Sequence, residues 1–159
     1  MTEAARIDSS AAAEPRVSYV IARLERAIRS EIGARVGPHG LTTLQYTTLS
    51  VLSRHGAPLS NAQLARRSYM TPQAMSEVID ALEGKGLIKR KPHPSHGRQL
   101  PATLTEKGRR VLAACELAVD EMEDRMLAGL GAQERAAFRK ALKAAVRSLS
   151  AGFPSADRV

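Results

Sequence analysis

The chain has 159 residues, of which 43% are hydrophobic and 3% aromatic, so it has room for one domain whose core is built from aliphatic side chains. A single cysteine, Cys115, excludes an internal disulfide, and no apolar run approaches the roughly 20 residues of a membrane-spanning helix. The net charge of +8 favours a polyanionic partner, although a charge that serves solubility alone would give the same total.

The N-terminal part of the chain divides into a tail and two helices. Residues 1–15 are small and polar and are predicted to be a disordered tail. They lack the apolar segment of a secretory signal, so a cytoplasmic location is expected. Apolar residues at helical spacing predict a first helix over residues 16–36, stopped by the glycine and proline that follow. A second helix is predicted to begin at Thr42, which forms a capping box with Gln45.

Two further capping signals begin a closely spaced pair of helices. Ser60 and Gln63 form a second capping box, at the start of a short helix that runs to about residue 68. Thr71 begins the next helix together with Pro72, because threonine is a favoured N-cap and proline is favoured at the first helical position. This second helix is predicted to end at the glycines of residues 84–86.

A two-stranded wing is predicted after this pair of helices. Residues 87–91 are typical of a strand, residues 93–97 of a turn, and residues 99–104 alternate between apolar and polar side chains. Pro101 lacks an amide hydrogen and therefore marks an edge strand. Two short helices followed by a β-hairpin describe a winged helix-turn-helix, a device that lays one helix into a DNA groove.

The chain closes with two long helices, predicted over residues 105–126 and 132–149. The winged lobe needs only residues 41–104, so the apolar stripes of residues 16–40 and 105–150 exceed what it can cover. Two-fold pairing of these terminal helices in a homodimer is the simplest way to bury them. A monomer whose helices fold back on its own lobe is the alternative. The predicted fold is mainly α-helical, with six helices and a small β wing.

The helix that begins at Thr71 is predicted to read DNA with its polar face. Gln73, Ser76 and Glu77 fall on that face, opposite the apolar residues that pack on the lobe, and Thr71 lies at its start. Glutamine pairs with adenine, serine with several base edges, and glutamate accepts from cytosine. A polar face that is only solvated is the alternative interpretation.

Phosphate contacts are predicted around this helix. Residues 60–98 hold seven basic and three acidic side chains, which is half of the net charge of the chain. Backbone amides at the start of the preceding helix are candidates to hold a phosphate, and basic side chains at its far end and on the wing reach the DNA backbone. The candidate residues are Ser60, Asn61, Arg66, Arg67, Lys89 and Arg98. For Lys89, a simple surface charge is an equally good interpretation.

These residues resemble the MarR family of bacterial transcriptional regulators. The resemblance covers roughly residues 17–149 and is most specific from Ala74 to Arg90, in the wing, and in the segment LTEKG at residues 104–108. It implies six helices with a winged helix-turn-helix, a dimer formed by the end helices, and a pseudo-palindromic operator on double-stranded DNA. Many family members are released from DNA by small aromatic or phenolic ligands bound between the dimer region and the DNA-binding lobe, so a small-molecule effector is expected.

One position departs from the family pattern. The family wing usually carries an aspartate two residues before its arginine, which is Arg98 here, and this chain has His96 at that position. A neutral histidine orients the arginine less well than an aspartate, but it can donate to a DNA phosphate, more strongly when it is protonated. His96 is therefore a predicted DNA contact, and the hypothesis is that operator affinity rises as the pH falls through the imidazole range.

Other candidate sites have weaker signals. Tyr19, His39 and Tyr46 lie near the expected effector cleft, where their rings suit a phenolic or carboxylate ligand, although ordinary packing explains them equally well. Cys115 lies in an apolar stripe, so a buried and inert thiol is expected. No metal site and no cofactor are predicted, because the two histidines of the wing have no third ligand nearby. No catalytic motif is found, so no enzyme is expected.

The sequence therefore predicts a sequence-specific transcriptional regulator, in the first place a repressor, with an activator left open. The second interpretation is a structural nucleoid protein that coats DNA without reading bases. It would lack the preference of roughly 10³-fold or more for its site over random DNA that a regulator shows. The third is an enzyme or carrier that has kept the fold, which would bind a ligand strongly without affinity for DNA.

Overall fold

The computed structural model describes residues 14–92 and 100–149. Within these residues the fold is mainly helical with a two-stranded wing, which confirms the predicted fold class. In chain order the elements are α1 (Val17–Val36), the 3₁₀ helix η1 (Gly37–His39), α2 (Thr43–His55), α3 (Asn61–Arg67), α4 (Pro72–Gly84), β1 (Ile88–Arg90), β2 (Ala102–Leu104), α5 (Glu106–Met126) and α6 (Ala132–Ser148). Most of the predicted tail, and the wing turn with His96 and Arg98, lie outside the described residues.

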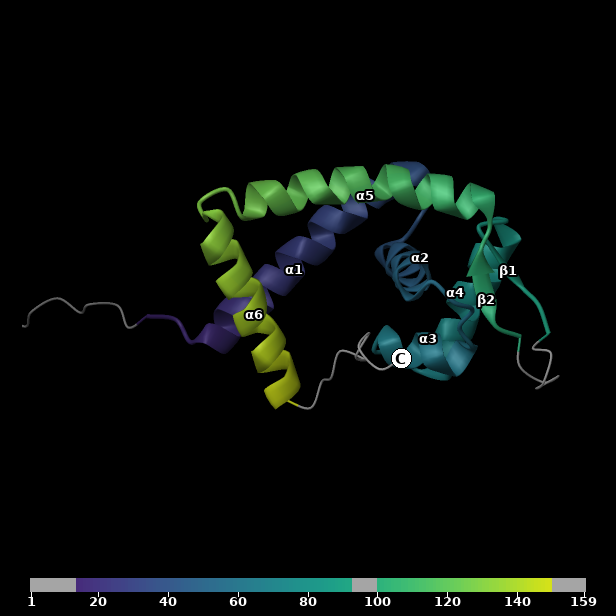
Figure 1. The fold of residues 1–159 in the computed structure, drawn as a ribbon, viewed down its shortest axis with the longest axis horizontal. Helices are drawn as coiled ribbons and strands as arrows, with labels where there is room; N and C mark the ends of the chain where they lie inside the picture. The colour runs from purple at the N-terminus through teal and green to yellow at the C-terminus, as the bar shows by residue number, and fades with distance from the viewer. Residues whose placement is uncertain (1–13, 93–99, 150–159) are drawn as a thin grey trace, which may run out of the picture.

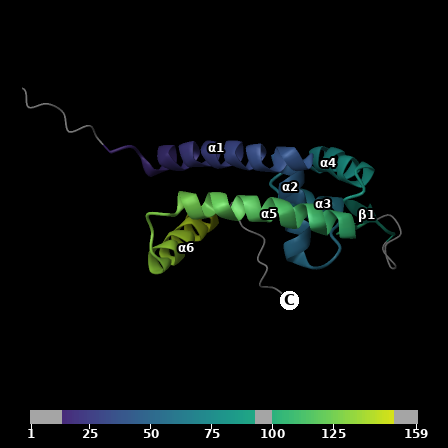
Figure 2. The same cartoon turned by 90° about the horizontal axis from the view of Figure 1, so that it is seen from above.

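The long helix α5 connects the two ends of the molecule. Helices α2, α3 and α4 and the two strands gather at one end of α5, and α6 extends from its other end (Figure 1). Helix α1 packs against α5, and both helices extend away from the winged lobe (Figure 2). The winged lobe and the terminal helices thus occupy different parts of the molecule.

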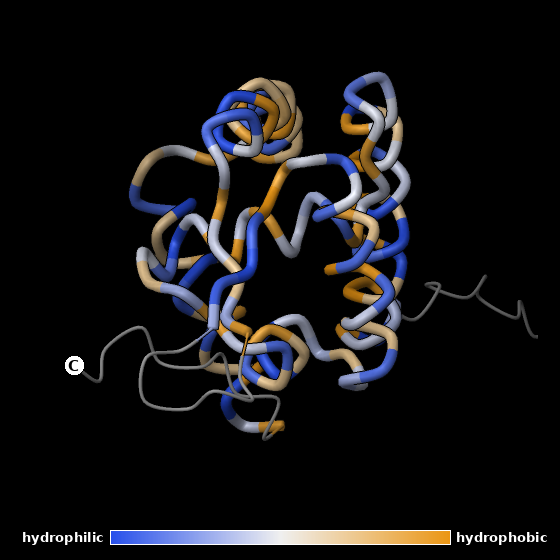
Figure 3. Tube along the Cα trace, turned by 90° about the vertical axis from the view of Figure 1, so that its right-hand side faces the viewer, coloured by the Kyte–Doolittle hydropathy of each residue, from blue (hydrophilic) through white to orange (hydrophobic). Residues whose placement is uncertain are grey.

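The hydrophobic core lies mainly inside the winged lobe. Hydrophobic and hydrophilic residues alternate along the helices, as expected for amphipathic elements (Figure 3). Side chains with essentially no exposed surface come from nearly every element of the lobe and from α5: Leu49, Leu59, Leu64, Met75, Leu82, Ile88 and Leu112. Cys115 is buried as predicted, and burial raises the pKa of its thiol. A buried cysteine with a raised pKa is a poor nucleophile, which agrees with an inert thiol.

The wing is attached to the start of α3. Strands β1 and β2 are antiparallel, with Ile88 opposite Leu104 and Arg90 opposite Ala102, and both are shorter than predicted. Ala102 also pairs with Leu59, because each residue donates its amide hydrogen to the other's carbonyl oxygen, at 2.8 and 3.2 Å. The link between α2 and α3 is therefore held to the wing by backbone hydrogen bonds.

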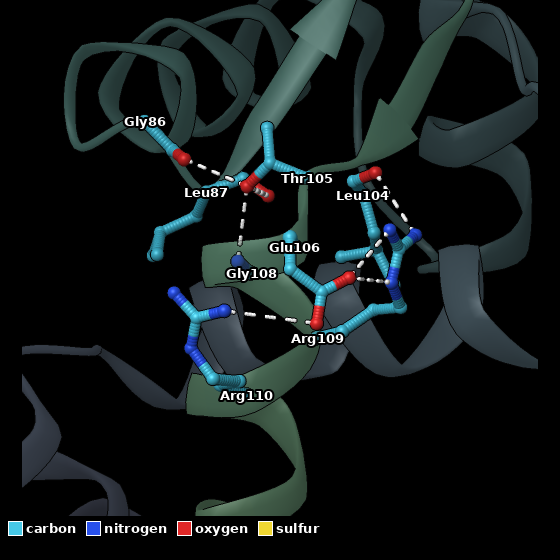
Figure 4. A network of polar contacts seen from close by, with 8 residues as sticks. All are labelled: Gly86, Leu87, Leu104, Thr105, Glu106, Gly108, Arg109 and Arg110. Carbon is cyan, nitrogen blue, oxygen red and sulfur yellow. Dashed lines mark hydrogen bonds and ion pairs between the residues drawn. The ribbon is translucent and has the colours of Figure 1, made fainter.

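A close backbone approach joins the end of α4 to the start of α5 (Figure 4). The hydroxyl of Thr105 contacts the carbonyl oxygens of Gly86 and Leu87 at 2.8 and 3.1 Å, and it accepts a hydrogen bond from the amide of Gly108 at 3.0 Å. A Cβ atom on Gly108 would lie only 2.0 Å from the carbonyl oxygen of Leu87. Glycine is therefore the residue that allows α5 to begin directly against the wing.

The terminal helices leave apolar surface uncovered. No residue of α6 is buried, and this helix does not pack on the winged lobe (Figure 1). Val17, Leu117 and Leu149 are 73%, 69% and 82% exposed, and Val20 and Ile21 of α1 are exposed as well. In the described part of the chain, no helix combines the length and hydrophobicity needed to cross a bilayer.

Candidate nucleic-acid interface

Helix α4 presents a polar face outward, as the sequence predicts. The hydroxyl oxygen of Thr71 caps the helix by accepting from the amide of Ala74 at 3.2 Å. The large apolar side chains of α4 are buried, whereas Gln73, Glu77 and Asp80 are exposed; the buried residues are Met75, Val78, Ile79 and Leu82. The exposed face therefore combines one amide with two carboxylates.

Ser76 differs from the other residues predicted on this face, because it is half-buried and already hydrogen-bonded. Its hydroxyl donates to the carbonyl oxygen of Pro72 at 3.0 Å and accepts from the side-chain amide of Asn61 at 2.8 Å. A serine hydroxyl has one hydrogen to donate, and Pro72 takes it here. The structure thus places Ser76 in the contact between α3 and α4 instead of on the free outer face.

The start of α3 carries the predicted capping box. The hydroxyl of Ser60 accepts from the amide of Gln63 at 3.3 Å, and the side chain of Gln63 accepts from the amide of Ser60 at 2.9 Å. These two amides are therefore occupied and are not the ones that would hold a phosphate. At the other end of α3, Arg66 is exposed and Arg67 is half-buried.

An ion-pair cluster joins the wing to α4. The guanidinium of Arg90 on β1 binds Glu83 through Nε at 2.9 Å and also through Nη2, and it contacts Asp80 at 2.9 Å. Hydrogen bonding to Arg90 lowers the pKa of Glu83. Sequence spacing gave no sign of this cluster, because its members lie on different elements. Lys89 of β1 is exposed and forms no ion pair with any residue that the structure describes.

Two lysines of the family-like segments have structural partners. Lys85 donates to the carbonyl oxygen of Gly40 at 2.6 Å and to the side chain of Gln45 at 2.9 Å, so it links α4 to the start of α2. Lys107 donates to the carbonyl oxygen of Lys85 at 2.8 Å. Part of the positive charge of the lobe therefore stabilises the fold and is not directed at a polyanion.

Of the three residues predicted for an effector site, Tyr19 and His39 lie at opposite ends of α1. Tyr19 is exposed near the start of α1 and lines a cavity of about 300 Å³ with Arg23. His39 is exposed beyond the far end of α1, and Tyr46 is buried in α2, where burial raises the pKa of its phenol. A second cavity, of about 320 Å³, lies between α1 and α5. Among the described residues, no group of three potential metal ligands is found.

Comparison with known proteins identifies the family. The MarR family model matches residues 39–99, which include α2, α3, α4 and β1 of the winged lobe. The HTH-type transcriptional repressor Rv2887 of Mycobacterium tuberculosis is 38% identical over 127 residues, which are 80% of this chain and 91% of the relative. The chain belongs to the MarR family of transcriptional regulators. This membership confirms the resemblance inferred from the sequence and the prediction of a regulator instead of an enzyme.

Solved structures of the same MarR-family relative agree with the fold. The M. tuberculosis Rv2887 complex with DNA superposes with a TM-score of 0.68 at 35% identity, covering 81% of this chain and 96% of that one. The Rv2887 complex with salicylic acid superposes with a TM-score of 0.65 at 37% identity, covering 82% and 96%. This MarR-family chain is thus similar, over nearly the whole relative, to a protein crystallised with DNA and with an aromatic acid.

Proposed function

We propose that this chain is a repressor that binds a pseudo-palindromic DNA site as a homodimer in the cytoplasm and is released by a small aromatic acid. The observation that carries the proposal is the exposed polar face of α4, with Gln73 and Glu77 beside a wing that bears Lys89. A short polar helix face flanked by a basic wing suits insertion into the major groove. The DNA complex of Rv2887 supports the same reading of this fold.

Base reading is assigned to the first two turns of α4. Gln73 would pair with adenine and Glu77 would accept from the amino group of cytosine, with Thr71 at the entrance of the groove. Ser76 can donate to a base only if it gives up its hydrogen bond to Pro72. This leaves two exposed side chains as the principal readers.

Phosphate contacts are assigned to groups on both sides of α4. Arg66 is exposed at the end of α3, Arg67 lies beside it, and Lys89 projects from β1. His96 and Arg98 stay predicted contacts of the wing turn, which lies outside the described residues. The capping box occupies the amide of Ser60, so a phosphate at the start of α3 would be held by the backbone amide of Asn61, which the box does not use. Such contacts set affinity and register, whereas base contacts set specificity.

A homodimer explains the exposed apolar residues of α1, α5 and α6. Two-fold pairing would bury Val17, Leu117 and Leu149 and place the two copies of α4 about one helical turn of DNA apart, roughly 34 Å. Leu117→Glu should shift the protein toward monomer in sedimentation equilibrium and lower its affinity for a two-half-site duplex. A wild-type protein that sediments as a monomer would remove the two-fold model.

The effector is proposed to be an aromatic carboxylic acid, a chemistry supported by the salicylic acid complex of Rv2887. Tyr19, His39 and Tyr46 stay candidates to contact it. Because α1 separates Tyr19 from His39, a site that included both would need the partner copy. Salicylate is a direct probe. It should release the protein from its selected duplex in a mobility-shift titration, with benzyl alcohol as the uncharged aromatic control.

Selection of bound duplexes from a random pool tests the core of the proposal. A regulator should enrich one sequence with two-fold symmetry and prefer it over random DNA by about 10³-fold or more. Tight binding without enrichment would instead identify a nucleoid-type protein that coats DNA. Salicylate binding without DNA affinity would identify a ligand carrier.

A further inference from the structure

A closed triangle of hydrogen bonds joins the first residue of α3 to the first two turns of α4. The side-chain nitrogen of Asn61 donates to the carbonyl oxygen of Pro72 at 2.9 Å and to the hydroxyl of Ser76 at 2.8 Å. The third side is the hydrogen bond from Ser76 to the carbonyl oxygen of Pro72, at 3.0 Å. The side-chain amide of Asn61 on α3 thus binds two residues of α4 at once.

The hydrogen bond to Pro72 requires a donor on the side chain of residue 61, and the amide of Asn61 supplies it. The carbonyl oxygen of Pro72 can only accept, so only the NH₂ end of the side chain can face it. The other end, the Oδ1 atom of Asn61, is buried and has no hydrogen-bond partner among the described residues. An unpaired buried acceptor costs free energy, which offsets part of what the two hydrogen bonds donated by this amide contribute.

Gln73, the proposed base reader, lies between the two α4 residues of the triangle. Gln73 directly follows Pro72 and precedes Ser76 by three residues, so both anchored residues lie in the same turns as Gln73. Base-edge hydrogen bonds tolerate little displacement, because glutamine must meet both edge atoms of adenine at once. A shift of this turn of α4 relative to α3 would therefore move Gln73 and weaken its hydrogen bonds to the base edge.

We propose that Asn61 is a positioning residue for DNA reading: its side-chain amide fixes the first turns of α4 against α3 and thereby sets the base preference of Gln73. This inference rests on the proposed DNA-binding function. From the sequence alone, Asn61 is a candidate phosphate contact. In this proposal its side chain instead acts within the protein, on α4, and does not contact DNA.

The variant Asn61→Asp tests the proposal with the least change of shape. Aspartate is nearly isosteric but cannot donate, and it is tolerated in the first turn of a helix. It also adds a negative charge near the DNA, so Ala62→Asp serves as the matched control, since Ala62 is the exposed next residue and lies outside the triangle. Affinities are measured for the duplex that wild type selects from a random pool and for its single-base variants.

The expected result is a loss of preference at one base pair. Asn61→Asp should lower discrimination there by about five- to tenfold, at the position that Gln73→Ala also relaxes. The double variant should relax it no further than Gln73→Ala alone, because both changes act through the same side chain. Ala62→Asp should weaken binding to all duplexes equally and leave the preference unchanged.

Three outcomes would overturn the proposal: unchanged discrimination in Asn61→Asp, relaxation at a different base pair, or additive losses in the double variant. If Asn61→Asp loses its helical circular dichroism, Ser76→Ala carries the same test, since it removes one side of the triangle from the other helix. Relaxation by Ser76→Ala at the Gln73 position supports the proposal, and relaxation elsewhere or none overturns it. Failure of the wild type to enrich any sequence would instead overturn the proposed function, before any variant is compared.

Discussion

Arg90 and Glu83 link the wing to α4 through three hydrogen bonds. The backbone amide of Arg90 donates to one carboxylate oxygen of Glu83 at 3.2 Å, and its guanidinium binds the other oxygen through Nε at 2.9 Å and through Nη2. The pair joins the end of α4 to β1, so the position of the wing is tied to that of the helix it flanks. Because the backbone amide and the guanidinium of Arg90 bind the same carboxylate, they fix the orientation of Glu83 as well as its distance from Arg90.

The Glu83–Arg90 pair should make stability depend on pH in the acid range. Arg90 lowers the pKa of Glu83 from the usual 4.5, so the unfolded chain takes up this proton first as the pH falls. The stabilisation is therefore fully present above about pH 4.5 and is lost as the pH falls through the folded-state pKa. Because the pair is partly exposed, we expect less than about 1 kcal/mol.

Urea unfolding of wild type and Glu83→Gln between pH 3 and pH 7 checks this expectation. Wild type should be the more stable protein near pH 7, and the difference should shrink toward pH 3. Glu121→Gln is the control, because Glu121 is exposed and has no ion pair among the described residues. A difference that stays constant across this range would mean that Glu83 does not act through its charge.

Gly108→Ala should destabilise the fold, because its Cβ would lie 2.0 Å from the carbonyl oxygen of Leu87. Backbone atoms have to move to relieve this contact, and we expect a loss of about 1–3 kcal/mol. Gly84→Ala is the matched control, since nothing lies within 4 Å of its added Cβ, and it should gain up to about 1 kcal/mol. Equal midpoints in urea for the two variants would contradict the close approach.

Thr105→Ala should also weaken the junction between the wing and α5. It removes the acceptor for the amide of Gly108 and the contacts to the carbonyl oxygens of Gly86 and Leu87, and N-cap losses of this kind cost about 0.5–2 kcal/mol. Thr105→Ser keeps the hydroxyl and should retain most of the stability. A serine variant as unstable as the alanine variant would assign the effect to the methyl group.

Gln73→Ala should relax base preference without a change of fold. Gln73 is exposed on α4, so its truncation leaves the core intact, and preference at one base pair should fall by about 1–3 kcal/mol. The measurement is affinity for the selected duplex and its single-base variants. If every base pair keeps its original preference, this face of α4 is not the reader.

Arg66→Ala should weaken binding uniformly. Arg66 is exposed at the end of α3, where a phosphate contact carries no sequence information. The slope of log affinity against log salt should decrease by about one, and the ranking of duplexes should stay the same. A slope equal to that of wild type would remove Arg66 from the contact set.

Several elements could be predicted from the sequence because the interactions that define them are local. The capping boxes at Thr42 and Ser60 and the Thr71 cap join atoms three residues apart, and all three are present. Amphipathic spacing likewise placed the buried faces of α4 and α5, and burial of Cys115 followed from the same spacing. Local geometry of this kind does not depend on the rest of the fold.

Contacts between distant residues were decided only by the tertiary structure. Ser76 was expected on the outer face of α4, but its hydrogen bond with Asn61 depends on how α3 crosses α4. Lys85 reaches Gly40, 45 residues away, and becomes part of the scaffold although sequence alone counts it as a free charge. The sequence by itself determined which helices form and which side of each is apolar. Only packing decided which polar groups are occupied within the protein and which stay available for DNA, because that depends on the distances between elements and not on spacing along the chain.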